Sequence, residues 1–245
     1  MLRRSQNPKC VARVLKVQNI SRRFGPMFAL DGITFTARRG EILGLIGPNG
    51  AGKTTLLDIV SGILPADGGS VLWEETPLPA PRRKHVMFYL PEAVTPYPDR
   101  RTIDVLALFA RLFAQPDDRL AGAIEGLALT PVLSTRVGAL SKGYRRRLLL
   151  AIGLLAPQPL IMIDEPFDGL DLKQTREVMG LLRRLCGADR TLLLSIHQLS
   201  DAERLCDRFV LLSGGSVKGE GNLEDLRARA GKEPAGLEEV LLALT

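Results

Sequence analysis

The sequence predicts an α/β fold in which a parallel β-sheet is covered by helices on both faces. The first observation is an alternation along the chain between short apolar runs, such as 160–163 and 191–195, and longer segments with helical spacing. The second is a glycine-rich segment at 47–54, which follows the apolar run 41–46 and precedes the helical pattern at 55–60. A strand, a glycine-rich loop and a helix in this order form one α/β unit.

The N-terminal part predicts β-strands joined by turns rather than by helices. Residues 11–20 and 33–37 alternate between apolar and polar side chains, and Phe24-Gly25-Pro26 supplies a turn between them. Three prolines make 76–83 a loop. The polar and basic residues 1–10 predict a flexible arm.

The middle of the chain predicts a helical insertion into the α/β pattern. From about residue 92 to 156 the apolar residues follow helical spacing, and Pro116, Pro131 and Pro157 punctuate the segment. Within it, helices are expected at 102–114, 117–129 and 142–156. Outside it, strands are expected at 70–73, 86–90, 160–164, 191–195 and 209–212. Helices are also expected near 172–186 and 199–206, with a hairpin at Gly214-Gly215 and two short helices over 222–245.

Bulk composition limits the class of protein. A chain of 245 residues with a net charge of +6 and only 5 % aromatic residues suits an α/β domain with a large aliphatic core. No basic stripe interleaved with aromatic residues is present, so nucleic acid is not an expected partner, and the basic runs at 3–4, 82–84 and 145–147 are interpreted as solvated faces. No apolar run is long enough to span a membrane, and no signal peptide is visible. The three widely spaced cysteines fit neither a disulfide framework nor a metal site, which favours the cytosol.

Residues 47–54 match a loop that wraps the phosphates of a nucleotide. Gly47-Pro48-Asn49-Gly50-Ala51-Gly52-Lys53-Thr54 has the pattern GxxxxGK[ST]. Its glycines allow positive φ and a close approach of the backbone, so that N–H groups form an anion site at the start of a helix. The pattern predicts that Lys53 reaches the terminal phosphates, that the Thr54 hydroxyl binds Mg²⁺ and that Thr55 belongs to the same ATP-binding segment. ATP and Mg²⁺ are the expected substrate and cofactor.

An acidic pair follows the apolar run 160–163. Asp164 and Glu165 end this predicted strand, and beside a phosphate-binding loop such a pair predicts a hydrolytic site. Asp164 would hold Mg²⁺, and Glu165 would act on water as the general base. His197 follows the strand 191–196, where it could reach a γ-phosphate; the alternative is that it caps the next helix.

Leu140-Ser141-Lys142-Gly143-Tyr144 precedes a predicted helix. Ser141 is a candidate N-cap, and small residues at a helix N-terminus could form a second anion site. The alternative is an ordinary capped helix without a ligand.

The order and spacing of these segments resemble the nucleotide-binding subunit of ABC transporters over about residues 11–220. The segments are the glycine loop, Ser141-Lys142-Gly143-Tyr144, Ile163-Asp164-Glu165-Pro166, Asp168-Gly169-Leu170-Asp171 and His197. The resemblance implies an α/β P-loop NTPase core with an N-terminal antiparallel β subdomain and an inserted α-helical subdomain at about 92–156. It also implies a single ATP-binding domain over 11–235 and a C-terminal helical tail over 222–245.

The resemblance further implies roles for individual residues. Phe24 is expected to stack on adenine, and Glu92 lies at the Q-loop, which senses Mg²⁺ and contacts the membrane subunit. Residues 141–144 form the signature loop, in which Ser141 and Gly143 bind the γ-phosphate held by the other subunit. Residues 168–171 form the D-loop at the dimer seam, and His197 is the switch histidine.

Three segments depart from the family pattern. Glu92 replaces the common glutamine of the Q-loop and adds a negative charge near Mg²⁺. In the signature loop Lys142 replaces a glycine and Tyr144 a glutamine, and the D-loop starts with Asp168 rather than serine. None of these departures removes a catalytic group, so an active ATPase is expected.

Three further segments are similar to ATPases that serve type-2 ABC exporters. They are Tyr89-Leu90-Pro91-Glu92, the signature segment with its trailing arginines, and the C-terminal segment 236–245. The similarity implies separate transmembrane permease subunits, a second ATP-binding subunit that is the same or a different chain, and a peripheral, cytoplasmic place on the inner face of the cell membrane.

Two alternatives remain at this point. One is a soluble ABC ATPase that acts on ribosomes or DNA, which the basic balance permits, although such proteins usually carry tandem ATPase halves and this chain has one set of motifs. The other is a degenerate chain that only binds nucleotide, against which Lys53, Glu165 and His197 argue.

Overall fold

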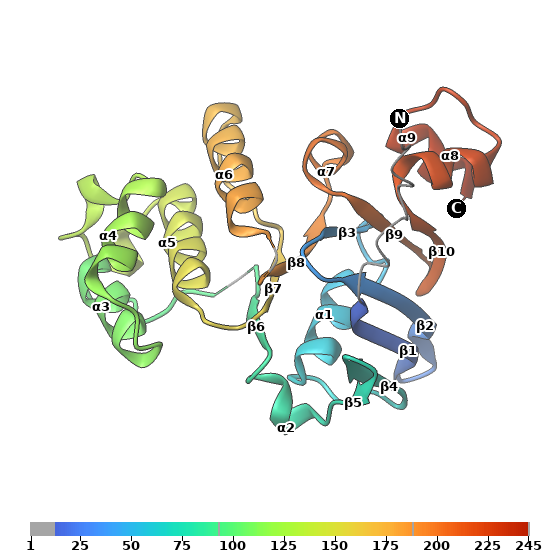
Figure 1. The fold of residues 1–245 in the computed structure, drawn as a ribbon, viewed down its shortest axis with the longest axis horizontal. Helices are drawn as coiled ribbons and strands as arrows, with labels where there is room; N and C mark the ends of the chain where they lie inside the picture. The colour runs from blue at the N-terminus through green and yellow to red at the C-terminus, as the bar shows by residue number, and fades with distance from the viewer. Residues whose placement is uncertain (1–12, 93, 188, 245) are drawn as a thin grey trace, which may run out of the picture.

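A computed structural model of the chain describes residues 13–92, 94–187 and 189–244. Two β-sheets and the helices around them form the fold, and Figure 1 shows helices α3, α4 and α5 as a group beside the sheets. The predicted α/β class is confirmed. The arm expected at 1–10 and the first two residues of the strand expected at 11–20 lie outside the described residues.

The larger sheet has six strands in the order β10-β9-β3-β8-β7-β6. They are β3 (Ile42–Ile46), β6 (Met87–Leu90), β7 (Leu160–Asp164), β8 (Thr191–Ile196), β9 (Arg208–Ser213) and β10 (Ser216–Gly221). Neighbours pair in parallel except β10, which returns antiparallel to β9 through the hairpin predicted at Gly214-Gly215. This order places the carboxyl ends of β3, β8 and β7 side by side, and ligands of parallel sheets bind at such ends.

Four antiparallel strands form the smaller sheet, in the order β2-β1-β4-β5. They are β1 (Arg13–Phe24), β2 (Met27–Arg38), β4 (Gly68–Trp73) and β5 (Thr76–Pro77). Strands β1 and β2 extend beyond the predicted runs up to the turn at Gly25-Pro26, where Phe24 pairs with Met27. Glu220 of β10 ties the two sheets together, because its carboxylate accepts hydrogen bonds from Thr36 of β2 (3.0 Å) and Arg208 of β9 (2.7 Å).

Both faces of the larger sheet are buried. On one face, helix α1 (Lys53–Ser61) shares an aliphatic core with the smaller sheet and with Leu43 and Leu45 of β3. On the other face, Ile42 and Ile46 of β3 share a second core with seven helices. These are α3 (Thr102–Leu112), α4 (Asp117–Gly126), α5 (Lys142–Leu155), α6 (Leu172–Leu185), α7 (Leu199–Leu205), α8 (Leu223–Ala230) and α9 (Leu237–Leu244). Alternate side chains of β3 therefore pack into the two cores, so the sheet is covered on both faces, as predicted.

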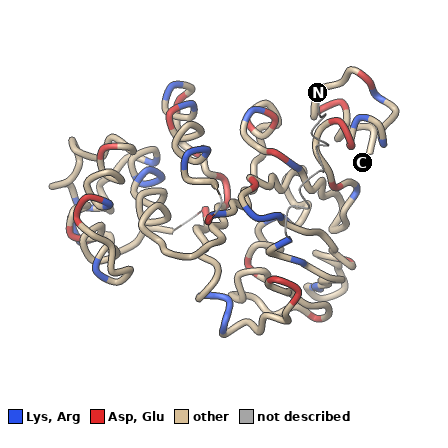
Figure 2. Tube along the Cα trace, viewed as in Figure 1, with Lys and Arg blue, Asp and Glu red and all other residues tan. Residues whose placement is uncertain are grey.

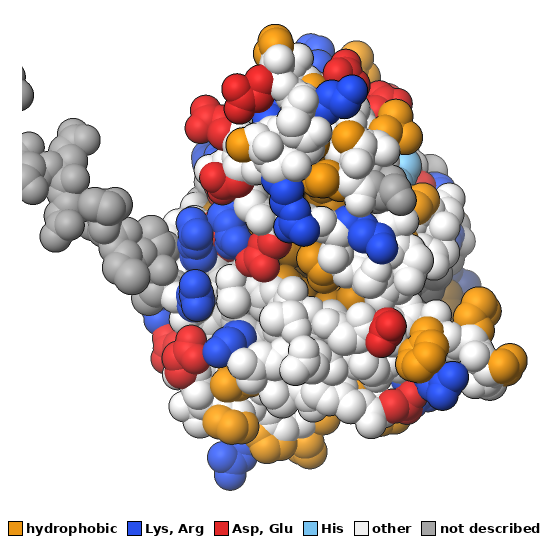
Figure 3. All heavy atoms as spheres, turned by 90° about the vertical axis from the view of Figure 1, so that its right-hand side faces the viewer, with side chains coloured by type: hydrophobic (Ala, Val, Ile, Leu, Met, Phe, Trp, Pro, Cys, Tyr) orange, Lys and Arg blue, Asp and Glu red, His pale blue; other side chains and the backbone are white. Residues whose placement is uncertain are grey.

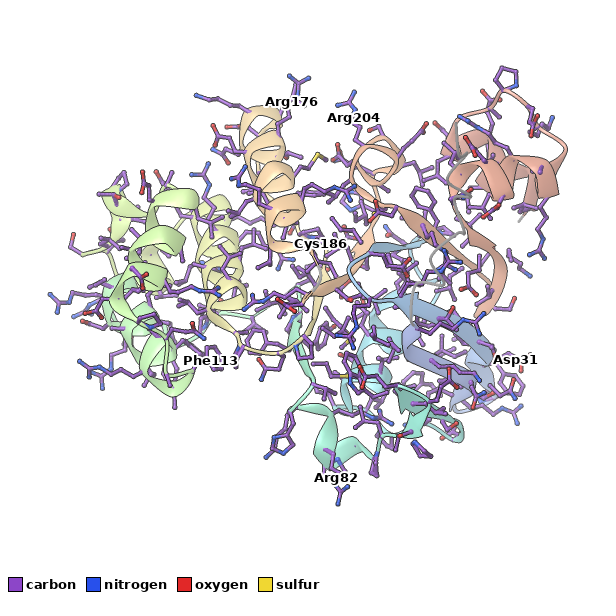
Figure 4. The ribbon with its side chains drawn as sticks, in the orientation of Figure 1. Asp31, Arg82, Phe113, Arg176, Cys186 and Arg204 are labelled. Atoms are coloured by element: carbon purple, nitrogen blue, oxygen red, sulfur yellow. The ribbon has the colours of Figure 1, made fainter. Side chains whose placement is uncertain are left out.

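Helices α3 and α5 are anchored directly to strand β6. Phe113, at the end of α3 (Figure 4), lies edge-on to Phe88, with ring centroids 5.6 Å apart. Gly153 lets α5 approach the same strand, since a Cβ at this position would lie 2.7 Å from the Leu90 side chain. Helix α5 is therefore held against the strand that leads to Glu92.

The prediction of a loop at 76–83 is wrong in part. Strand β5 pairs at the edge of the smaller sheet, with Pro77 opposite Leu72. Helix α2 (Ala80–Arg83) follows, with Pro79 at its N-cap and a further proline in its first turn. Proline is tolerated on an edge strand and in the first turn of a helix, so the prolines here fit regular structure rather than preventing it. Helix α4 also ends at Gly126, three residues before the predicted end, and a 3₁₀ turn at Thr130–Val132 follows.

Charged residues of both signs are spread over the molecule. Figure 2 shows them along most of the trace, and Figure 3 shows basic and acidic side chains mixed on one face. In the basic run at 82–84, Arg82 is exposed and points away from α2 (Figure 4), as expected of a solvated face. Arg83 is an exception, because it is half-buried and donates a hydrogen bond to the Leu78 carbonyl at 3.1 Å. No helix in the described residues is long and apolar enough to cross a membrane.

Candidate functional site

The loop between β3 and α1 has a backbone that requires glycine. Gly50 and Gly52 have positive φ angles of 80° and 100°. A Cβ at Gly47 would lie 2.2 Å from the Leu212 carbonyl oxygen, and one at Gly52 would lie 2.8 Å from the Ala29 carbonyl oxygen. The glycines therefore let the loop lie directly against β9 and β2.

Lys53 is the first residue of α1, and its side chain is buried. Its Nζ atom donates hydrogen bonds to the carbonyl oxygens of Gly47 at 2.7 Å and Pro48 at 3.2 Å. Gly52 at the N-cap has no side chain with which to cap the helix, so the N–H groups of the first turn are left for a ligand. A lysine beside such a helix start forms a site for an anion such as a phosphate.

Thr54 and Asp164 bring two oxygen ligands together. The Thr54 hydroxyl donates a hydrogen bond to Oδ2 of Asp164 at 2.8 Å, and the Ser195 hydroxyl donates to Oδ1. Asp164 is buried at the end of β7. Mg²⁺ prefers hydroxyl, carboxylate, water and phosphate oxygens, so this pair fits the predicted metal. In the part of the chain that the structure describes, no cluster of three or more His, Cys, Asp or Glu side chains forms a metal site.

Glu165 lies in a backbone conformation that L-residues rarely adopt, with φ of 51°. Its N–H donates a hydrogen bond to the Ser195 carbonyl at 3.1 Å. Its Oε2 atom lies 2.5 Å from Nδ1 of His197. Burial raises the pKa of the Glu165 carboxyl, and the hydrogen bond with His197 opposes that shift.

The predicted nucleotide-binding residues meet at one open cavity of about 270 Å³. Phe24, Glu92, Asp164 and Glu165 line it, together with 49–50 and 52–55 of the glycine loop. Gly47, Pro48 and Ala51 complete the loop without lining the cavity. His197 lines a neighbouring hollow with Glu165, and its side chain is half-exposed. The structure thus brings together residues from four segments that are far apart in the sequence.

Phe24, which the resemblance assigns to adenine, lines the cavity from the end of β1. Its ring is 48 % exposed, so a flat ligand can reach it. The guanidinium carbon of Arg22 lies 5.1 Å from the ring centroid, and Arg22 is itself held by Asp67 at 2.8 Å. This cation–π contact and ion pair fix the ring at the end of β1.

The signature residues form a different hollow. Ser141 caps α5 by accepting a hydrogen bond from the Tyr144 N–H at 3.3 Å, so its predicted N-cap role is confirmed. Residues 141–144 line an open hollow of about 300 Å³ with Gly169 and Asp171, and none of its lining residues lines the nucleotide cavity. The described chain therefore keeps its glycine loop and its signature segment apart.

A family model described as ABC transporter matches residues 30–168 of this chain. The chain belongs to the ABC transporter ATP-binding family. Nod factor export ATP-binding protein I of Ralstonia nicotianae is 34 % identical over 219 residues, which cover 87 % of this chain and 68 % of that protein. A doxorubicin resistance ATP-binding protein of Mycobacterium tuberculosis is 34 % identical over 214 residues, which cover 84 % of this chain and 64 % of that protein. A solved structure described as an ATP binding subunit of an ABC transporter has a TM-score of 0.85 at 31 % identity, covering 94 % of this chain and 99 % of that one.

In this ABC transporter chain the D-loop packs on the signature segment. A Cβ at Gly143 would lie 2.8 Å from the Gly169 carbonyl oxygen, so the two backbones touch. Lys142 pairs with Asp168 at 2.7 Å, which joins two of the residues that depart from the family pattern. Asp171 accepts a hydrogen bond from the Gln174 N–H at 2.8 Å and forms a capping box at the start of α6. Leu170 lies in the turn between Gly169 and Asp171.

The interpretation of 145–147 as a solvated face is wrong for two of its arginines. Arg146 and Arg147 are 4 % and 8 % exposed, because they lie on the side of α5 that faces the protein. Arg147 donates a hydrogen bond to the Leu127 carbonyl, and Arg146 donates to the carbonyl of Asp164. Sequence reasoning missed Arg146 as a site residue. Its spacing of three and four residues from the apolar Leu149 and Leu150 is the signal that could have placed it on the inner face.

Proposed function

We propose that this chain hydrolyses ATP to ADP and phosphate with Glu165 as the general base. The observation that carries the proposal is the Glu165–His197 pair, 2.5 Å apart, beside the cavity that Lys53 and Thr54 line. A carboxylate next to a phosphate-binding loop is suited to accept a proton from water. Burial raises the pKa of Glu165, which makes its carboxylate a stronger base.

In the proposed reaction a water oxygen bonds to the γ-phosphorus, and the bond from that phosphorus to the β,γ-bridging oxygen breaks. The water proton passes to Glu165, and ADP leaves. Lys53 and the N–H groups of the glycine loop bind phosphate oxygens and stabilise their charge. His197 orients the Glu165 carboxylate toward the water, and Phe24 stacks on the adenine. When held by Thr54 and Asp164, Mg²⁺ would neutralise phosphate charge.

The proposal includes a second ATP-binding subunit. The signature hollow and the nucleotide cavity share no lining residue, which supports a role for Ser141 and Gly143 toward an ATP bound elsewhere. Two subunits, identical or different, would close head to tail around two ATP molecules. Residues 168–171 would lie at the seam between them.

We further propose that this closure drives separate transmembrane permease subunits of an exporter. Two relatives carry the names of export and drug-resistance ATP-binding proteins, which supports an export role. Glu92 is exposed after β6 and lines an open hollow with Arg145 and Leu149 of α5, so it is accessible to a permease. The chain would then work peripherally on the cytoplasmic face of the cell membrane.

A purified Glu165→Gln variant tests the catalytic part of the proposal. Loss of a general base lowers turnover by roughly 10²–10⁴-fold, while the amide keeps the shape of the site, so ATP affinity is expected to stay near wild type. Glu239→Gln, on an exposed residue of α9, is the matched control and should hydrolyse ATP normally. Turnover of Glu165→Gln close to that of the control would contradict the role of Glu165.

Affinity purification from detergent-solubilised membranes tests the transport part. Mass spectrometry of the co-purified proteins is expected to identify a transmembrane permease. Recovery of ribosomal proteins or DNA without any membrane protein would instead favour the soluble ABC ATPase.

A further inference from the structure

Arg146 lies beneath the carboxylates of the nucleotide cavity. Its side chain is 4 % exposed and projects from the first turns of α5, the helix that Ser141 caps. One guanidinium nitrogen, Nη2, donates to the carbonyl of Asp164, and the other, Nη1, donates to the carbonyl of Pro91 at 3.4 Å. A single side chain therefore joins α5 to the end of β7 and to the segment that carries Glu92.

The carbonyl that Arg146 holds belongs to the peptide that leads into Glu165. The other side of this peptide is also held, because the Glu165 N–H donates to the Ser195 carbonyl at 3.1 Å. Glu165 has a φ of 51°, a left-handed conformation that persists only when its surroundings hold it. Rotation of this peptide would break both hydrogen bonds and change the φ of Glu165, which helps to set the direction of its side chain. The two hydrogen bonds oppose that rotation from opposite sides.

Arg146 also supplies positive charge where carboxylates gather. Burial lowers its pKa, and nearby carboxylates oppose this effect. These carboxylates belong to Asp164, Asp168, Glu165 and Glu92. An arginine stays charged in proteins, so Arg146 offsets the negative charge that Glu92 brings in place of the family's glutamine. The Nε atom of Arg146 is buried and has no hydrogen-bond partner in the described residues, which fits a side chain positioned by its two terminal nitrogens.

The neighbouring arginine is buried as well but makes different contacts. Arg147 is 8 % exposed, and its guanidinium donates to the Leu127 carbonyl, just after α4. That contact stays among the helices of 102–155. Only Arg146 of the two reaches the turn that carries Glu165.

We propose that Arg146 is a positioning residue for ATP hydrolysis, which holds the Asp164–Glu165 peptide so that Glu165 points at the attacking water. The inference rests on the proposed role of Glu165 as the base. Arg146 is not among the residues that line the nucleotide cavity, so its proposed effect on hydrolysis passes through Glu165. Its hydrogen bonds therefore connect the signature helix α5 and the Glu92 segment to the peptide that precedes the base.

The first test compares Arg146→Gln, Arg146→Lys and a control in the full chain. Arg190→Gln is the control, because Arg190 is half-buried and donates to two carbonyls at the opposite end of α5, those of Leu154 (3.3 Å) and the C-cap Ala156 (2.8 Å). Arg146→Gln is expected to lower kcat at least tenfold with ATP affinity within about threefold of wild type. Arg146→Lys should keep an intermediate kcat, since it retains the charge and one donor group.

The control separates positioning from stability. The proposal predicts that Arg190→Gln loses at most twofold in kcat, even if its unfolding temperature falls as much as that of Arg146→Gln. A kcat for Arg146→Gln within twofold of wild type would overturn the inference. So would a loss of kcat that Arg190→Gln matches at equal unfolding temperature. If Arg146→Gln does not fold, Arg146→Lys decides by the same comparison of kcat.

A double-variant cycle tests whether Arg146 acts through Glu165. Single-turnover hydrolysis is measured for Glu165→Gln with and without Arg146→Gln. Because the base is already absent, the second substitution is expected to lower the residual rate less than twofold. A full tenfold further loss would overturn the role of Arg146 while leaving Glu165 as the base. Wild-type turnover by Glu165→Gln itself would overturn the proposed function and this inference together.

Discussion

The Nδ1 atom of His197 lies 2.5 Å from the Oε2 atom of Glu165, although 32 positions separate the two residues in sequence. Each residue directly follows a strand: Glu165 follows β7, and His197 follows β8. These strands pair in parallel with Asp164 opposite Ser195, so the register of the sheet brings the two side chains to the same end. The contact is thus set by the most buried part of the fold rather than by a surface loop.

The Glu165–His197 contact predicts the acid limb of the pH–activity profile. A general base works only when ionised, so activity is lost as pH falls through its pKa. Burial raises the pKa of Glu165 above the ordinary value of 4.5, and the His197 hydrogen bond lowers it again in part. His197→Ala removes that hydrogen bond, so its acid limb should shift to higher pH, together with a lower kcat. The measurement is kcat against pH, and an unchanged or lower-shifted limb in His197→Ala would contradict the interaction.

Lys53→Ala is expected to abolish ATP binding at its own loop. The buried ammonium is the side-chain cation of the anion site, and its loss removes one positively charged partner of the phosphates. Calorimetric titration with ATP should show a loss of affinity of 100-fold or more, an order of magnitude typical of losing a charged contact of about 3 kcal/mol. Lys84→Ala, at an exposed lysine after α2, should bind ATP as the wild type does. Tight binding by Lys53→Ala would show that the nucleotide occupies another site.

Ser141→Arg is expected to leave ATP binding largely intact and to block ATP-driven dimerisation. The substitution fills the signature hollow, which shares no lining residue with the nucleotide cavity. Light scattering with ATP, in a Glu165→Gln background that slows hydrolysis, measures dimer formation. Ser141→Ala is the control for loss of the helix cap, which costs about 1 kcal/mol without adding bulk. Dimerisation of Ser141→Arg at wild-type ATP concentrations would rule out the proposed use of this hollow.

Gly143→Ala is expected to lower stability, because a Cβ there would lie 2.8 Å from the Gly169 carbonyl oxygen. Overpacking of this kind costs about 1–3 kcal/mol. The unfolding temperature of a domain of this size should fall by roughly 2–4 °C for each kcal/mol. Gly122→Ala, at an exposed position of α4 with open space around it, should gain about 0.5–1 kcal/mol instead. Equal unfolding temperatures for both variants would refute the close packing of the signature segment on the D-loop.

Much of the fold could be predicted from local sequence patterns. The apolar runs that become β3, β7, β8 and β9 are buried on both faces, and this leaves a clear signal in the sequence. The glycine loop is also local, since its turn and its helix lie within one short segment. The order of the strands within the sheet was the further information needed to bring Asp164 and Glu165 to the loop.

Features that depend on tertiary packing could not be predicted in the same way. The run Arg145-Arg146-Arg147 looks like a solvated face, yet two of the three are buried because α5 turns them toward carbonyls of distant segments. The left-handed conformation of Glu165 has no local sequence signal, since a non-glycine residue adopts it under tertiary constraint. The Lys142–Asp168 pair likewise joins residues whose proximity only the folded chain reveals.

A mixture of Lys53→Ala and Ser141→Arg chains tests the central claim most directly. Each variant alone lacks one half of every composite ATP site, so each should be inactive in ATP hydrolysis. If the glycine loop of one subunit works with the signature hollow of the other, a mixed dimer contains one intact site, and mixing should restore hydrolysis above that of either variant. A mixture that stays as inactive as its components would contradict the two-subunit site.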